Sequence, residues 1–95
     1  MGQEKSVEAY LRDQVKAIGG KAYKFVSPGN DGVPDRLVCL PGGRVAFVET
    51  KSPGKRSTPL QENRQNELRA LGFEVEVIDS KAGVEYFILT RRAKG

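Results

Sequence analysis

Two acidic residues and one basic residue in the first half of the chain have the side chains needed to hydrolyse a phosphodiester bond. Asp35 follows a proline, and Glu49 and Lys51 stand two residues apart at the end of an apolar run. Two carboxylates that meet repel each other unless a cation lies between them, and hard divalent cations bind oxygen ligands. A metal ion activates water, while lysine stabilises charge that develops on phosphorus. This set predicts metal-dependent hydrolysis, with Mg²⁺ or Mn²⁺ bound by Asp35 and Glu49.

A β-hairpin would bring these three residues to one place. The proline before Asp35 keeps the chain extended there. Residues 36–40 and 44–51 are rich in Val, Leu and Phe, and a Pro-Gly-Gly turn signal separates them. Because side chains alternate across a strand, Glu49 and Lys51 share one face of the second strand. The pattern therefore predicts two antiparallel strands whose open end carries the charged residues.

A second helix is predicted to begin at Thr58-Pro59-Leu60-Gln61, with Thr58 as its N-cap. Thr58 and Gln61 have the spacing of a capping box, in which the glutamine side chain returns to the N-cap amide. From the residues alone, capping is favoured over catalysis for Gln61. Gln65 lies one turn further along and is predicted to line the same groove.

The remaining segments predict further elements around the hairpin. Residues 3–18 have the three- and four-residue apolar spacing of an amphipathic helix. Residues 21–27 and 73–79 are typical of strands. Residues 82–90 fit either a helix or a strand, and we expect a helix because a serine stands at the N-cap position.

Length and composition restrict the chain to one domain, residues 1–95, with one modest core. No apolar run approaches the ~20 residues of a membrane span, so we expect a cytoplasmic protein without membrane contact. The sequence contains no histidine and one cysteine, Cys39. It therefore excludes an internal disulfide, a typical zinc site and a Cys-His nucleophile.

The net charge of +4 and the pI of 9.4 favour a polyanionic partner. Lys55 and Arg56 stand in a Ser-, Pro- and Gly-containing segment directly after Lys51. Such a loop is placed to contact the phosphates of DNA, which positions a substrate without reading its sequence. We therefore predict DNA contacts from Lys55, Arg56 and, across the groove, Gln65.

These motifs, in this order, resemble the VRR-NUC (virus-type replication-repair nuclease) branch of the PD-(D/E)xK nucleases, in its stand-alone phage and viral form. The resemblance rests on Gly32-x-Pro34-Asp35, on Glu49-x-Lys51 and on Gln61 at the start of a helix. It covers nearly the whole chain. It implies an α/β fold of the restriction-endonuclease type, with a mixed sheet of about four strands flanked by helices in the order α-β-β-β-α-β-α.

The resemblance also implies roles for further residues. Glu8 in the first helix would bind the metal directly or through water, and the Thr50 backbone carbonyl would be another ligand. Gln61 would hold water or phosphate, which makes it functional as well. The catalytic set expected from the resemblance is Asp35, Glu49, Lys51, Gln61 and Glu8.

The expected function is that of a metal-dependent DNA endonuclease, selective for branched DNA and acting as a homodimer on four-way (Holliday) junctions. One alternative is a flap or nicking nuclease that acts as a monomer. Another is a DNA-binding module that keeps the nuclease fold without catalysis. An RNA-binding protein is a third reading, which rests only on charge.

Overall fold

The computed structural model describes residues 3–92, which form three helices and four strands. The predicted element order α-β-β-β-α-β-α is confirmed, and so is the helix over residues 82–90. The first strand is shorter than predicted and ends at Lys24 instead of residue 27. In chain order the elements are α1 (Gln3–Ala17), β1 (Lys21–Lys24), β2 (Arg36–Leu40), β3 (Arg44–Thr50), α2 (Pro59–Ala70), β4 (Glu74–Ile78) and α3 (Lys81–Arg92).

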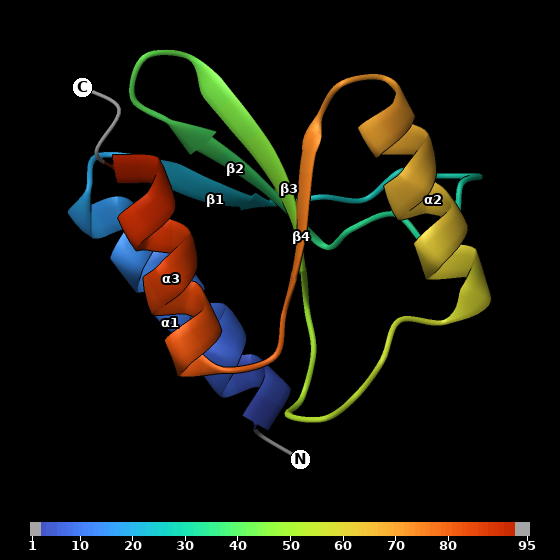
Figure 1. Ribbon diagram of the computed structural model, residues 1–95, viewed down its shortest axis with the longest axis horizontal. Coiled ribbons are helices and arrows are strands. Elements are labelled where there is room, and N and C mark those ends of the chain that lie inside the picture. Colours follow the sequence, from blue (N-terminus) through green and yellow to red (C-terminus); the bar gives the residue numbers. More distant parts are fainter. Residues whose placement is uncertain (1–2, 93–95) are drawn as a thin grey trace.

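The four strands form one mixed sheet in the order β1-β2-β3-β4. The pairs β1–β2 and β2–β3 are antiparallel, whereas β4 runs parallel to β3. A parallel pair needs a long crossover connection, and α2 supplies it (Figure 1). The hairpin of β2 and β3 is therefore central in the sheet, and the end of β3 is where the crossover to α2 begins.

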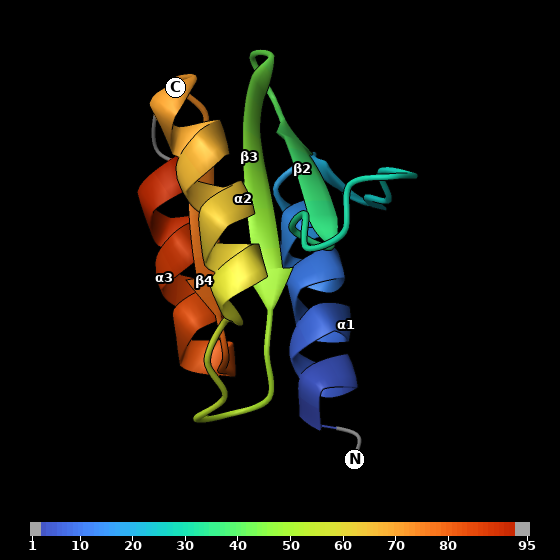
Figure 2. The same ribbon diagram turned by 90° about the vertical axis from the view of Figure 1, so that its right-hand side faces the viewer.

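The helices cover opposite faces of the sheet. Figures 1 and 2 show α1 and α3 side by side on one face and α2 on the other. The main apolar core fills the α1 and α3 side, where each fully buried large side chain stabilises the fold by about 1.5–3 kcal/mol. Its residues are Val7, Leu11, Val15, Ala22, Val38, Leu40, Ala46, Val48, Ile78, Val84, Phe87 and Ile88.

Aromatic residues pack together on the α2 face of the sheet. The Phe47 ring on β3 lies edge-on to Phe25 and to Phe73, with centroids 5.4 and 5.5 Å apart. Because side chains alternate along a strand, Glu49 lies on this same face, two positions beyond Phe47. The α2 face therefore changes from aromatic to charged at the end of β3. Among residues 3–92, no helix is long and apolar enough to cross a membrane.

Candidate active site

Asp35 stands directly before β2, next to the buried Pro34. Its Oδ1 accepts a hydrogen bond from the Thr50 amide at 3.1 Å, and its Oδ2 accepts one from the Thr50 hydroxyl at 2.8 Å. Both oxygens are thus fixed to the last residue of β3. This arrangement brings Asp35 to the end of the hairpin, beside the strand that carries Glu49.

Glu49, Lys51 and Gln61 form a second connected group at the end of β3. The Lys51 ammonium donates to Gln61 Oε1 at 2.7 Å and lies 3.6 Å from Glu49 Oε2. Gln61 Nε2 donates to the same glutamate oxygen at 3.3 Å. The Glu49 and Lys51 side chains are only 7% and 14% exposed, so this carboxylate and this ammonium meet in a largely water-excluded place.

Gln61 caps α2 and also contacts the charged residues at the end of β3. Thr58 is the N-cap of α2, and its hydroxyl accepts from the Gln61 amide at 3.2 Å. Gln61 Oε1 accepts from the Thr58 amide at 2.9 Å, which completes the predicted capping box. Since the same oxygen also accepts from Lys51, capping the helix and contacting the site are compatible.

The carboxylates of the site repel each other. Burial raises the pKa of Glu49 from the ordinary value of 4.5 to about 7, and the negative charge of Asp35 adds to the rise against the opposing Lys51 charge. Burial also raises the pKa of Asp35, although the two Thr50 hydrogen bonds oppose this, and the Glu8 charge raises it further. The end of β3 therefore has an excess of buried negative charge, which favours a cation or a proton.

Arg36 was missed at the level of sequence, and it positions Glu8. Its Nε and Nη2 donate to Glu8 Oε2 at 2.9 and 2.6 Å, and its Nη1 donates to the Ala22 carbonyl at 3.2 Å. The sequence contained a signal for this pair. Arg36 lies two positions before Val38 and therefore shares the apolar face of β2, and a buried guanidinium needs a carboxylate partner. Glu8 thus approaches Asp35 while paired with Arg36.

Asp35 and Glu49 are close enough for the charge of Asp35 to raise the pKa of Glu49, which makes them the main candidate oxygen donors. Within residues 3–92, no three acidic, histidine or cysteine side chains gather closely enough to form a metal site by themselves. Thr50, whose carbonyl was predicted as a further ligand, is the residue whose amide and hydroxyl hold Asp35.

The loop between β3 and α2 exposes Lys55 and Arg56, as predicted. It is held at Gly54, whose amide donates to Asp79 Oδ2 at 3.1 Å. Gln65 differs from the prediction because it is only 3% exposed and its amide donates to the Ser57 hydroxyl at 3.0 Å. Gln65 has no open surface for a direct DNA contact; it holds the basic loop instead.

Comparison with known proteins identifies the fold and the family. The chain is 54% identical over 79 residues to "Putative nuclease p44" of Acyrthosiphon pisum secondary endosymbiont phage 1, a match that covers 83% of this chain and 85% of the phage protein. It also superposes on a solved structure described as "VRR_NUC domain" with a TM-score of 0.88 and 32% identity, over 94% of this chain and 97% of that one. The chain belongs to the VRR-NUC family. No model of a protein family matches it.

The VRR-NUC fold and the similarity to a protein named as a nuclease both support a nuclease activity. Folds of this kind usually work with a divalent metal ion. The residues expected from the resemblance, Glu8, Asp35, Glu49, Lys51 and Gln61, all lie around the end of β3 or contact residues there.

Proposed function

We propose that this VRR-NUC chain is a divalent-metal-dependent endonuclease that hydrolyses phosphodiester bonds in DNA. The observation that carries the proposal is the cluster at the end of β3, where Glu49, Lys51 and Gln61 contact one another beside Asp35. A surface that only binds phosphate gains nothing from two buried carboxylates, because their charge opposes that of the ligand. A hydrolytic site with a metal ion needs them.

The donor set fits a hard divalent cation. Asp35 and Glu49 offer only oxygen atoms, as Mg²⁺ and Mn²⁺ prefer. Burial is the main cause that raises the pKa of both carboxyl groups, so a cation between them would stabilise their charged forms. We assign the Thr50 carbonyl as a further ligand. Glu8, whose Oε2 is bonded to Arg36, would contribute directly or through water.

The protein's own residues would position the reacting groups. When bound, the metal ion supplies Lewis acidity toward the phosphate and the attacking water. Lys51 is held by Gln61 and Glu49, so its charge is already placed to stabilise the negative charge that develops on phosphorus. The Lys51 ammonium would also orient the attacking water, and only its neutral amine form could deprotonate that water. Gln61 has an amide at the same place and would hold water or a phosphate oxygen.

The exposed side chains of Lys55 and Arg56 extend from the loop that leaves the site. We assign them to the DNA backbone, where they position the substrate without reading its sequence. Gln65 supports these contacts indirectly through its bond to Ser57. We also propose that the protein works in the cytoplasm, which is the host's cytoplasm if a phage encodes it.

We further propose that two copies form a homodimer that cuts branched DNA, four-way junctions above all. A junction has two equivalent strands, and a twofold dimer would offer two active sites to cut them. We place the dimer interface on α3, where the apolar side chains of Tyr86 and Leu89 are 69% and 57% exposed and lie three residues apart. Large apolar side chains that share one exposed helix face are typical of an interface.

A cleavage assay with labelled linear duplex, flap and four-way-junction DNA tests the activity. We expect cleavage with Mg²⁺ or Mn²⁺, none in EDTA, and a preference for the junction. Asp35→Asn and Lys51→Ala should each reduce the rate by orders of magnitude. Asp31→Asn is the matched control, because Asp31 is an exposed aspartate outside the site. Cleavage in EDTA would refute metal dependence, and DNA binding without cleavage would identify a non-catalytic module.

Light scattering at micromolar protein, with and without junction DNA, tests the dimer separately. We expect a dimer that becomes monomeric in the Tyr86→Lys/Leu89→Lys variant. A wild-type protein that stays monomeric with DNA present, yet cleaves it, would favour a monomeric flap or nicking nuclease.

A further inference from the structure

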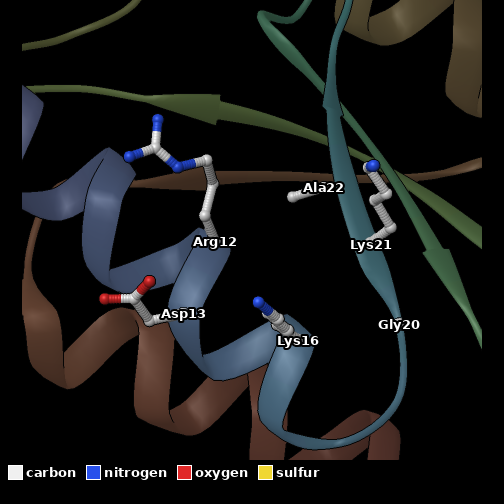
Figure 3. Close-up of a pocket in the computed structure, with 6 residues that line it drawn as sticks. All are labelled: Arg12, Asp13, Lys16, Gly20, Lys21 and Ala22. Atoms are coloured by element: carbon white, nitrogen blue, oxygen red, sulfur yellow. The ribbon is translucent and has the colours of Figure 1, made fainter.

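A pocket with a basic rim lies beside α1, on the side of the sheet opposite the Lys55 loop. It has a volume of about 430 Å³ and is lined by residues of α1 and of the segment that leads into β1. Figure 3 shows Arg12 and Lys16 extending from α1 on one side of it, while Gly20, Lys21 and Ala22 form the other wall. Asp13 also lines the pocket, but it points away from β1 in this view.

The spacing of these residues connects the pocket to the active site. Glu8, Arg12 and Lys16 are four residues apart, so they follow one side of α1. Four residues advance a helix by about 6 Å, so Arg12 stands one turn beyond Glu8. Glu8 is bonded to Arg36, the residue that follows Asp35. The row of cations therefore begins one turn from the site and leads away from it.

Within residues 3–92, the positive charges of Arg12 and Lys16 have no acidic partner. In the part of the chain that the structure describes, Arg36, Arg44, Arg64 and Arg91 each form an ion pair with a glutamate. No carboxylate lies within ion-pair distance of Arg12 or Lys16 among these residues. Their charge is available to a ligand.

Solvation alone is the simpler explanation for exposed cations, and lysines on an edge strand such as β1 also discourage pairing with other chains. That explanation fits Lys21, whose ammonium lies 5.1 Å from the centre of the Tyr23 ring. It does not account for a concave surface between two elements with unpaired Arg12 and Lys16 on one wall. A concave surface with an excess of positive charge, here Arg12, Lys16 and Lys21 against Asp13, concentrates the potential that attracts a polyanion.

We propose that this surface, the α1–β1 groove, binds the phosphodiester backbone of a DNA arm that extends beyond the cleavage site. The inference rests on the DNA substrate proposed above. The Lys55 loop and α1 lie on opposite sides of the end of β3 (Figures 1 and 2). A substrate held at the site can therefore reach basic residues in two directions, and a branched DNA has arms in two directions. The groove would contribute affinity and orientation for the second arm.

The test measures DNA affinity against salt concentration by fluorescence anisotropy, in EDTA and in an Asp35→Asn background, so that no cleavage occurs. The parent is compared with Arg12→Gln/Lys16→Gln on junction DNA. Each lost phosphate contact lowers the slope of log K against log salt by about 0.9, so two lost contacts lower it by about 1.8. Between 50 and 200 mM salt, the parent should then lose roughly tenfold more affinity than the variant.

Two controls make the result specific. Lys81→Gln/Arg92→Gln removes the same charge from α3 and should leave the slope unchanged. Arg12→Lys/Lys16→Arg keeps the charge in the groove and should keep the slope. Thermal unfolding of each variant checks the fold, which we expect to be retained because Arg12 and Lys16 form no ion pair with any residue that the structure describes.

An unchanged slope in Arg12→Gln/Lys16→Gln would refute the proposal that the α1–β1 groove binds DNA. An equal change of slope in the α3 control would refute it as well. Either result would leave the proposed nuclease intact, because cleavage by the unmodified protein is measured separately. A parent that binds no DNA would overturn the groove and the DNA substrate together.

Discussion

Glu49→Gln should make the metal-free protein more stable while it removes nuclease activity. Burial and the neighbouring Asp35 raise the pKa of Glu49 to about 7. The unfolded chain ionises this group near 4.5. Above pH 7 the folded protein therefore contains an ionised Glu49 that would be more stable in the unfolded chain, and this difference lowers the free energy of unfolding. Glutamine has the shape of the protonated side chain and carries no charge, so it would remove this cost and also remove a metal ligand.

The size of the effect follows from the shift. A pKa difference of roughly 2.5 corresponds to about 3.4 kcal/mol as an upper bound, and partial solvent screening of the group reduces the expected gain to about 2 kcal/mol. In this domain, about 2 kcal/mol raises the Tm by roughly 10 °C. The folded pKa lies above the unfolded one, so the folded state binds more protons between pH 4.5 and 7 and wild-type stability falls as pH rises through that window.

Thermal unfolding in EDTA at pH 5 and pH 8 is the direct measurement. At pH 8 we expect Glu49→Gln to melt about 10 °C above the wild type, and at pH 5 the difference should nearly disappear. Mg²⁺ or Mn²⁺ should raise the Tm of the wild type and have little effect on the variant. Glu76→Gln is the control, because Glu76 is paired with Arg91 away from the site. A variant that melts below the wild type at pH 8 would refute the reasoning.

Two further predictions concern neighbouring residues. Thr58→Ala should lower stability by about 1 kcal/mol with a near-normal cleavage rate. Gln61→Glu keeps a capping side chain but should cleave more slowly, because a carboxylate cannot donate to Glu49. If Gln61→Glu cleaves as fast as the wild type after correction for unfolded protein, Gln61 is purely structural. Arg36→Met should lower the free energy of unfolding by about 3 kcal/mol, because it leaves the Glu8 charge buried without a partner. In urea unfolding, the double variant Glu8→Leu/Arg36→Met should recover most of this loss. A double variant that stays as unstable as Arg36→Met would mean that the ion pair itself stabilises the fold.

The sequence predicts the elements well where one periodicity dominates. The turn signal between two apolar runs specified the hairpin, and alternation placed Glu49 and Lys51 on one face, where their side chains meet. The fourth strand was predicted from its alternating residues, whereas the mixed sheet was expected from the resemblance, and β4 does pair parallel to β3. The hairpin and the alternation depend on local residue order, so they can be predicted without knowing the tertiary contacts.

The contacts that orient the site depend on residues far apart in the chain. Arg36 and Glu8 are separated by 28 positions, and no local pattern says which carboxylate meets a buried guanidinium. Gln65 was predicted to face a groove because it lies one turn beyond Gln61, yet the helix turns it toward Ser57. Helical spacing fixes which residues share a face, and only the packing of α2 against the sheet decides whether that face is open.

Gln61 caps α2 and contacts Glu49 and Lys51 with the same side-chain amide. A glutamine that caps a helix must point its oxygen at the N-cap amide, and that orientation fixes where its NH₂ group points. Here the fixed NH₂ group reaches Glu49, and the same oxygen also receives Lys51. The cap therefore holds the amide in one rotamer before any substrate binds, so the start of α2 and the geometry of the site depend on each other. A residue with a strong local explanation can for this reason still belong to an active site.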